Sequence, residues 1–260
     1  MPTRITLEQK DHILLIGLNR PEKLNAADEQ MLHELSLAYG ELDSNPDLWV
    51  GLVFAHGDHF TAGLDLGDLG PKMASGQVNL VPKGGLDPWG MTTKQVSKPV
   101  VMAIQGTCFT FGVELALASE IVVSAENSVF AQLEVSRGIL PFGGGTLRFP
   151  AAAGWSNAMR YLLTGDKFGS AEALRMNVVT EVVPLGKQFD RAFELAKRIA
   201  AQAPLAVQET LDSARRLLEP ESQSERMFVY SRLNKLMKTN DVQRGMQAFM
   251  TKTEAKFEGN

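Results

Sequence analysis

Two glutamates, Glu114 and Glu134, lie twenty positions apart in a stretch that is otherwise small, apolar and rich in glycine. A carboxylate among such neighbours loses hydration, so either its charge is stabilised locally or its pKa rises. Two such groups facing one cavity can divide acid and base work between them. The alternative is that both are ordinary structural carboxylates, with Glu114 facing solvent in the first turn of a helix, where the helix dipole favours it.

Two turns of small residues could provide the other half of such a site. One turn lies in residues 59–66, after a predicted strand that ends near Ala55, and the second spans residues 106–112 and leads into the predicted helix with Glu114. If N–H groups from both turns converge, they form an oxyanion hole for a carbonyl that gains negative charge. Spacing alone leaves that convergence open. A third loop, residues 143–146, matches no phosphate-binding motif and is interpreted as a tight turn near the site.

The elements expected to position these residues alternate between strands and helices. Residues 5–8 and 13–18 predict a hairpin. Asp28 predicts the N-cap of a helix whose apolar residues run from Met31 to Leu42 at helical spacing. Further buried strands, most followed by a turn and a helical segment, indicate an α/β layered core; the strands are expected at 50–55, 100–104, 121–123 and 178–183, and examples of the helices at 113–118 and 156–163.

Two regions differ from this core. Residues 70–90 are rich in glycine and proline and predict an irregular segment, either a lid or a disordered insertion, and apolar residues such as Trp89 favour a lid. From about residue 186 to 256 the pattern is almost wholly helical, with Pro204 and Pro220 placed to begin helices. We therefore expect a core domain of residues 1–195 and a helical region of residues 196–260, packed on the core, on a partner subunit or on both.

The composition excludes several classes of function. The chain has 260 residues, of which 44% are hydrophobic and 22% charged, as in globular proteins with a substantial core. A net charge of -4 argues against nucleic-acid binding. No apolar run reaches the ~20 residues of a membrane span, and neither terminus resembles a targeting signal. Cys108 is the single cysteine and the four histidines lack metal-ligand spacing, so we expect a cytoplasmic protein without a metal site.

The assembled motifs resemble the crotonase, or enoyl-CoA hydratase/isomerase, superfamily, and the likeness extends from about residue 13 to residue 257. The resemblance implies an α/β fold, a crotonase-like spiral of ββα turns with a C-terminal helical trimerisation region. It also implies an acyl-CoA thioester substrate, assembly as a homotrimer or a hexamer (a dimer of trimers), and no separate cofactor, because coenzyme A is part of the substrate. The matching motifs are Leu18–Ala26, Phe60–Asp65, Gly106–Ala116, Phe130–Glu134, Gly138–Thr146 and Leu163–Asp166.

The same resemblance implies roles for individual residues. The backbone N–H groups of Leu64 and Phe111 would bind the thioester oxygen. Glu114 and Glu134 would hold a water molecule, which Glu114 chiefly activates while Glu134 delivers a proton to the α-carbon. Asp65 would mainly support its loop. The full set expected to bind substrate is Ala62, Gly63, Asp65, Trp89, Gly112, Leu133, Arg137 and Phe142, and the set expected near coenzyme A is Lys23, Leu24, Ala26, Lys252 and Phe257.

The expected reaction is syn hydration of a trans-2-enoyl-CoA to a 3-hydroxyacyl-CoA through a thioester enolate, in fatty acid metabolism. The alternatives are a Δ3-Δ2 enoyl-CoA isomerase that uses chiefly Glu134, a thioester hydrolase or decarboxylase, and a non-catalytic acyl-CoA-binding protein whose Phe111 blocks the pocket. Two departures from the hydratase pattern bear on the pocket. Phe111 stands in a turn that is usually glycine-rich, and Ser136 and Arg137 stand where aliphatic residues are common, so the acyl pocket is expected to be smaller or more polar.

Overall fold

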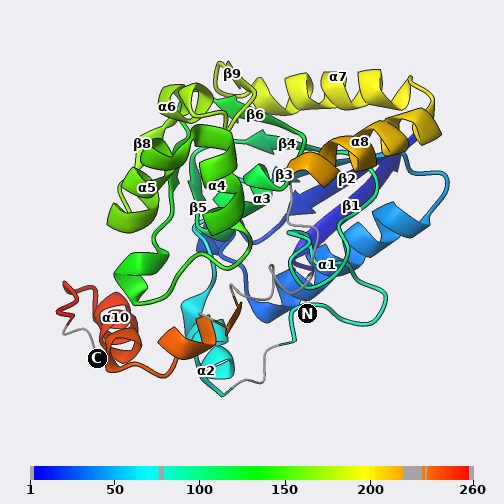
Figure 1. Ribbon diagram of the computed structural model, residues 1–260. Helices are drawn as coiled ribbons and strands as arrows, with labels where there is room; N and C mark the ends of the chain where they lie inside the picture. The colour runs from blue at the N-terminus through cyan, green and yellow to red at the C-terminus, as the bar shows by residue number, and fades with distance from the viewer. Residues whose placement is uncertain (1–2, 76–78, 219–229, 232, 258–260) are drawn as a thin grey trace.

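The protein is built on a six-stranded sheet, seen in the computed structural model, which describes residues 3–75, 79–218, 230–231 and 233–257 (Figure 1). The strand order is β1-β2-β3-β4-β6-β9, with β1 and β2 antiparallel and the other neighbours parallel. The hairpin and the buried strands predicted at 50–55, 100–104 and 121–123 are confirmed, whereas the strand predicted at 178–183 covers only Glu181–Val183 and is half-buried. Their bounds are β1 Ile5–Lys10, β2 Ile13–Leu18, β3 Val50–Ala55, β4 Val100–Ile104, β6 Ile121–Ala125 and β9 Glu181–Val183.

Helices cover both faces of this sheet, which explains why its strands are continuous apolar runs rather than alternating ones. Ile13 and Leu15 of β2 belong to the apolar cluster under α7 (Gln188–Ala200), whereas Leu14 and Ile16 belong to the main core, which includes α1 (Glu29–Ser44). In Figure 1, α7 and α1 accordingly lie on opposite sides of the sheet. The predicted N-cap of α1 is confirmed, because the Asp28 carboxylate accepts a hydrogen bond from the backbone N–H of Met31 at 2.9 Å.

A second, three-stranded sheet leads into the two helical segments that contain the two glutamates. It consists of β5 (Thr107–Phe109), β7 (Val129–Ala131) and β8 (Phe168–Gly169), with β5 and β7 parallel and in the register Cys108 opposite Phe130. The strand β5 leads into α3 (Phe111–Leu117), and β7 leads into the 3-10 helix η2 (Glu134–Arg137). Because the carboxyl ends of parallel neighbours meet at one sheet edge, Glu114 and Glu134 are brought to the same place.

The helix α2 (Leu66–Ala74) corrects the expectation that residues 70–90 lack regular structure, which is wrong for residues 70–74. The Asp65 carboxylate accepts from the N–H of Gly67 and caps the helix, and Lys72 forms an ion pair with Asp68 one turn away. These interactions outweigh the breaking signals of Gly70 and Pro71, which dominate the sequence pattern.

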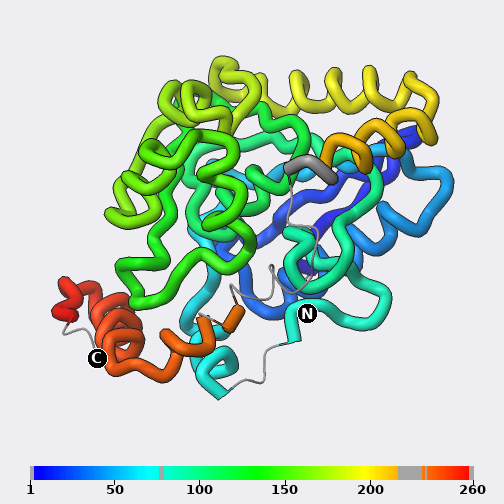
Figure 2. Tube along the Cα trace, in the orientation of Figure 1, coloured from blue at the N-terminus to red at the C-terminus, as the bar shows by residue number. Residues whose placement is uncertain are grey.

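The C-terminal part of the chain is helical, as predicted. Pro204 begins α8, whereas Pro220 lies outside the described residues. The helix α7 continues across residue 195, where the domain boundary was expected, and packs on the sheet. In Figure 2, α10 and the following segment lie at an edge of the molecule far from α7. The remaining helices are η1 (Pro21–Lys23), α4 (Gly145–Ala153), α5 (Trp155–Thr164), α6 (Ser170–Arg175), α8 (Pro204–Leu218) and α10 (Asn240–Thr251).

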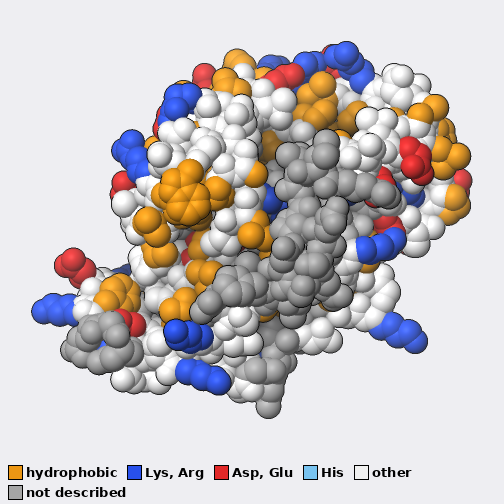
Figure 3. Space-filling view, viewed as in Figure 1, with side chains coloured by type: hydrophobic (Ala, Val, Ile, Leu, Met, Phe, Trp, Pro, Cys, Tyr) orange, Lys and Arg blue, Asp and Glu red, His pale blue; other side chains and the backbone are white. Residues whose placement is uncertain are grey.

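The surface carries mixed charge. Lys/Arg and Asp/Glu side chains are interspersed on the face shown in Figure 3, in keeping with the small net charge of -4. Within the described ranges, no helix combines the length and the apolarity that crossing a bilayer requires.

Candidate active site

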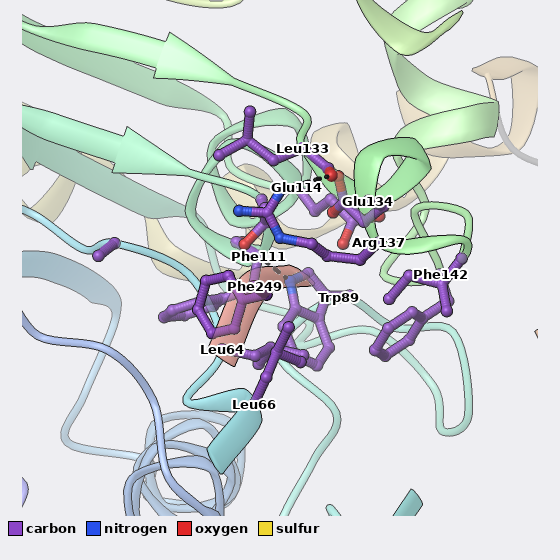
Figure 4. A pocket seen from close by; sticks show the side chains of 13 residues that line it. Leu64, Leu66, Trp89, Phe111, Glu114, Leu133, Glu134, Arg137, Phe142 and Phe249 are labelled. Atoms are coloured by element: carbon purple, nitrogen blue, oxygen red, sulfur yellow. Dashed lines mark hydrogen bonds between the residues drawn. The ribbon is translucent and has the colours of Figure 1, made fainter. Parts of the chain in front are cut away.

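A small chamber of about 60 Å³ brings together side chains from α2, α3, η2, α10 and the loops around them (Figure 4). Its polar lining consists of Glu114, Glu134, Arg137 and Thr110, and the other lining side chains are apolar. Its size leaves room for water beside the carboxylates. The lining residues are Ala62, Leu64, Leu66, Trp89, Thr110, Phe111, Glu114, Leu133, Glu134, Arg137, Ile139, Phe142 and Phe249.

Glu114 is held by the glycine loop that precedes α4. Its Oε1 accepts a hydrogen bond from the backbone N–H of Gly145 at 2.8 Å, and only 3% of the residue is exposed. Gly144 has a φ of +99°, and a Cβ at Gly143 would lie 2.8 Å from the Oε2 of Glu114. The prediction of a tight turn near the site is therefore confirmed. Glycine is required there because the backbone itself approaches the carboxylate.

Glu134 is held by the side chain of Gln132, two residues earlier. When the Gln132 amide is oriented to satisfy both of its polar ends, its nitrogen donates to the two carboxylate oxygens of Glu134 at 3.1 and 3.2 Å. The same nitrogen donates to the backbone carbonyl of Thr110 at 3.2 Å. Glu134 is 5% exposed, and the neutral amide of Gln132 is a hydrogen-bond donor to its carboxylate in this buried position.

Burial makes both carboxyl groups weak acids. Burial raises the pKa of Glu114 to about 7, although the amides of Gly145 and Gly143 and the charge of Arg148 oppose the rise. Burial, and secondly the charge of Glu114, raise the pKa of Glu134 well above its ordinary value. Groups that interact in this way lose their protons as a pair. Near neutral pH the site can therefore hold one proton to give and one carboxylate to receive, which is what paired acid and base catalysis requires.

The raised pKa of Glu114 predicts a pH-dependent stability difference. The folded state holds this proton more tightly than the unfolded state, so the free energy of unfolding falls as the pH rises from about 4.5 to about 7. The loss is about 3 kcal/mol, at 1.36 kcal/mol per pH unit of displacement. Glu114→Gln removes this term, so we expect the variant to gain stability relative to the wild type between about pH 4.5 and pH 8. Urea unfolding of the wild type and of Glu114→Gln at about pH 4.5 and at about pH 7 measures the two free energies of unfolding. If the difference between the two proteins is the same at both pH values, the prediction is wrong.

The two turns that were candidates for an oxyanion hole are joined directly. The N–H of Thr61 donates to the carbonyl of Thr107 at 2.9 Å, and the N–H of Phe109 donates to the carbonyl of Thr61 at 3.0 Å. Gly63, with a φ of +103°, lies against Thr110, whose Oγ1 would be 2.3 Å from a Cβ at position 63. The two turns therefore lie side by side, and the convergence of their N–H groups on one oxygen stays a prediction.

Leu64 and Phe111 follow these contacts and line the same chamber. Among the described residues, neither backbone N–H donates to a protein acceptor. For Phe111 this is expected, because it is the first residue of α3 and the first N–H groups of a helix have no partner within it. Both amides are thus available to a ligand.

The Phe111 ring forms part of the chamber wall. The residue is 1% exposed, and its ring packs edge-on against Trp89, with centroids 6.2 Å apart and planes at 87°. The indole Nε1 of Trp89 donates to the backbone carbonyl of Phe111 at 3.4 Å. The bulky residue thus fixes Trp89 in place, and the chamber remains open beside it.

Most of the residues expected to bind substrate line the chamber, namely Ala62, Trp89, Leu133, Arg137 and Phe142. Gly63 and Gly112 contribute by close packing, since a Cβ at Gly112 would lie 2.5 Å from the Cγ2 of Thr61. Asp65 lies outside the lining. It caps α2 and accepts from the Nη1 of Arg20 at 2.8 Å, which suits the loop-supporting role expected for it.

Other lining residues were missed by sequence reasoning, namely Leu66, Thr110, Ile139 and Phe249. Thr110 could have been predicted from the sequence, because it stands next to Phe111 in a turn of small residues. The structure adds that its φ is +50°, which is unusual for threonine. Phe249 carried none, because its place depends on where α10 packs.

The residues expected near coenzyme A lie around the chamber. The carbonyl of Leu24 accepts from the N–H of Ala62 at 2.9 Å and so ties the segment Lys23–Ala26 to the chamber wall. Lys252 and Phe257 line a separate cavity of about 710 Å³, which shares Arg137 and Phe249 with the chamber. A further cavity, of about 470 Å³, shares Leu64, Trp89 and Phe142 with the chamber. Binding of coenzyme A by these residues stays a prediction.

The helix α10 rests on η2 backbone to backbone. A Cβ at Gly245 would lie 2.6 Å from the backbone carbon and oxygen of Arg137, and one at Gly138 would lie 2.9 Å from the Cα of Val242. No side chain fits between the two segments, so the positions of Arg137 and Phe249 are set together.

Comparison with known proteins agrees with this geometry. Residues 8–260 match the Enoyl-CoA hydratase/isomerase family. A probable mitochondrial enoyl-CoA hydratase of Dictyostelium discoideum is 30% identical over 95% of this chain and 88% of its own. The crystal structure of a probable enoyl-CoA hydratase/isomerase from Mycobacterium abscessus is 45% identical, with a TM-score of 0.80 over 99% of both chains. That of a carnitinyl-CoA hydratase from Mycobacterium avium is 28% identical, with a TM-score of 0.88 over both full chains. The chain therefore belongs to the enoyl-CoA hydratase/isomerase family and has the crotonase fold.

Proposed function

We propose that this protein is an enoyl-CoA hydratase that adds water syn across the double bond of a trans-2-enoyl-CoA. One observation carries the proposal. Two buried glutamates, in the helical segments that follow the neighbouring parallel strands β5 and β7, line a chamber together with Leu64 and Phe111, whose backbone N–H groups donate to no acceptor among the described residues. Relatives that are named enoyl-CoA hydratases and are 30% and 32% identical to this chain support the proposal.

In the proposed mechanism, the amides of Leu64 and Phe111 hydrogen-bond to the thioester oxygen and stabilise the enolate. Each such donor is typically worth about 2.7–4 kcal/mol in the transition state. Ionised Glu114 takes a proton from water as the hydroxyl oxygen bonds to the β-carbon. Protonated Glu134 then gives its proton to the α-carbon of the enolate. Gly145 and Gln132 hold the two carboxyl groups in place during these transfers.

The direct test is a set of trans-2-enoyl-CoA thioesters of different chain length, followed by the loss of ultraviolet absorbance of the conjugated thioester. Hydration in heavy-oxygen water must place solvent oxygen in the product. An isomerase, the second candidate, moves the double bond without incorporating solvent oxygen. Tight acyl-CoA binding without turnover would instead support the non-catalytic alternative.

The two raised pKa values predict a bell-shaped pH profile for hydration. Turnover is expected to rise through about pH 7 as Glu114 becomes ionised, and to fall at higher pH as Glu134 loses the proton it donates. The measurement is kcat against pH with a saturating substrate. Glu114→Gln should lack the rising limb in its residual activity. A wild-type rate independent of pH across this range would contradict the assignment of the two roles.

We infer further that the protein works in the cytoplasm as a homotrimer or a hexamer, on acyl-CoA of fatty acid metabolism, with no cofactor beyond the coenzyme A of its substrate. The helical C-terminal region and the exposed apolar residues of α5, Trp155 at 71% and Leu163 at 70%, support assembly. Light scattering during gel filtration measures the number of subunits, and a monomer at micromolar concentration would contradict the assembly.

A further inference from the structure

Among the described residues that line the chamber, Arg137 is the one cation. In Figure 4 its side chain extends from η2 across the chamber toward Leu133 and Phe249. The guanidinium carbon lies 4.9 Å from the centre of the Phe249 ring, and Nη1 donates to the carbonyl of Leu133 at 3.5 Å and to the Oγ of Ser136. The aromatic ring and the neighbouring carbonyl therefore fix the plane of the guanidinium.

This guanidinium has no anionic partner within the described part of the chain, where no carboxylate oxygen lies within 4.0 Å of it. Arg20, Arg175 and Arg191, by contrast, each form ion pairs at 2.7–2.8 Å. Half-buried guanidinium groups are normally paired, because losing hydration without a partner is costly. Burial accordingly lowers the pKa of Arg137.

Glu134 does not fill this role. It lies three residues earlier on the same short helix, yet no ion pair joins the two side chains within 4.0 Å, and burial keeps the Glu134 carboxyl protonated to an unusually high pH. A protonated Glu134 leaves the charge of Arg137 uncompensated beside the reacting carbons. A ligand that carries its own carboxylate would supply the missing partner.

We propose that Arg137 binds a carboxylate on the acyl group, so that the preferred substrates are coenzyme A monothioesters of unsaturated dicarboxylic acids. This inference rests on the proposed hydratase function and names its substrate class. A planar guanidinium fork matches a carboxylate with two parallel hydrogen bonds, and Nη1 is the only nitrogen of the Arg137 guanidinium that donates to a protein acceptor among the described residues, which leaves Nε and Nη2 for a ligand.

Coenzyme A itself offers a second anion, its phosphates. Arg137 also lines the cavity that contains Lys252, so a phosphate there is the competing ligand. The chamber favours the acyl carboxylate. A thioester held by Leu64 and Phe111 has its acyl group in the space that Arg137 shares with both glutamates, whereas the whole pantetheine arm separates the phosphates from it.

The experiment compares trans-glutaconyl-CoA with a neutral analogue of the same shape, in which an isopropyl group replaces the free carboxylate, and with crotonyl-CoA. We expect the wild type to favour the acid over the neutral analogue in kcat/KM by on the order of 10²-fold. Arg137→Leu should lose this preference, because its kcat/KM should fall far more on the acid than on the neutral analogue, and Arg137→Lys should retain part of the preference. Arg160→Leu is the matched control, because Arg160 is exposed, lies over the Tyr161 ring and is outside the chamber.

Each other outcome has a distinct meaning. If wild-type protein hydrates crotonyl-CoA and the neutral analogue but shows no preference for the acid, this proposal fails and the hydratase function stands. If it hydrates none of the three, the hydratase function fails first. An equal loss on every substrate in Arg137→Leu, abolished with thioesters of dephospho-coenzyme A, would assign Arg137 to the phosphate instead. Should Arg137→Leu not fold, inhibition of the wild type decides, since glutaryl-CoA must then inhibit far better than its saturated neutral analogue.

Discussion

Replacing Glu134 by glutamine is expected to lower the rate of enoyl-CoA hydration by about 10²–10⁴-fold, the contribution of a positioned general acid or base. Glutamine keeps the shape of the side chain but has no proton to give to the α-carbon. Glu114→Gln should cause a loss in the same range, because an amide cannot accept the proton of the attacking water. The double variant should lose little more than the worse single variant, since the two groups act as a unit on one substrate and the effects of such groups are not additive. The measurement is the absorbance of the conjugated thioester under saturating substrate.

The controls separate lost chemistry from lost structure. Glu209→Gln changes an exposed glutamate of α8 and should leave turnover unchanged. Binding of a saturated acyl-CoA should change little in either active-site variant, because the thioester is held by backbone N–H groups. Hydration at the wild-type rate in both single variants would eliminate the mechanism. Loss in Glu114→Gln alone would leave the hydratase reaction standing but assign the proton transfer at the α-carbon to another group.

Replacing Gly63 by alanine is expected to lower kcat by about 10²–10³-fold, the usual effect of losing one oxyanion-hole donor. The new methyl group would lie 2.3 Å from the Oγ1 of Thr110, so the turn before Leu64 must move away from the turn before Phe111. The amide of Leu64 moves with it. Steady-state hydration rates measure the change, and the fall should be in kcat more than in KM because the donor acts mainly on the enolate.

A second glycine provides the matched control. Gly154 also has a left-handed φ, +77°, but no atom lies within 4 Å of a Cβ placed there. Gly154→Ala should therefore lose a similar amount of stability from backbone strain, about 1–2 kcal/mol, without losing kcat. Adding Thr110→Ala to Gly63→Ala removes the colliding oxygen and should restore part of the rate. If Gly63→Ala and Gly154→Ala affect kcat alike, the joined turns do not position a catalytic amide.

Local signals in the sequence were sufficient to predict those helices and strands that their own residues determine. Asp28 beside an apolar helical repeat predicts α1 and its cap, and the apolar runs predict the buried strands of the main sheet. The two glutamates stood out because carboxylates are rare in such apolar surroundings. The helix α2 was missed since Gly70 and Pro71 are strong breaking signals, and the ion pair and cap that overcome them are weak features of a sequence.

Features that depend on packing between distant segments could not be predicted in the same way. The joined turns at Thr61 and Phe109 arise from hydrogen bonds across residues far apart in the chain, so spacing left their convergence undecided. Phe249 reaches the chamber only because α10 packs on η2. The orientation of the Phe111 ring depended on Trp89, which lies in a long segment with no periodic pattern to place it.

The close backbone contacts of Gly245 with Arg137 and of Gly138 with Val242 couple the position of α10 to the proposed active site. Rigid main chain touches rigid main chain there, so a shift of α10 cannot be absorbed by a change of side-chain rotamer. A ligand that binds Lys252 or Phe257 and displaces α10 is therefore expected to displace η2 as well, the short helix that begins with Glu134.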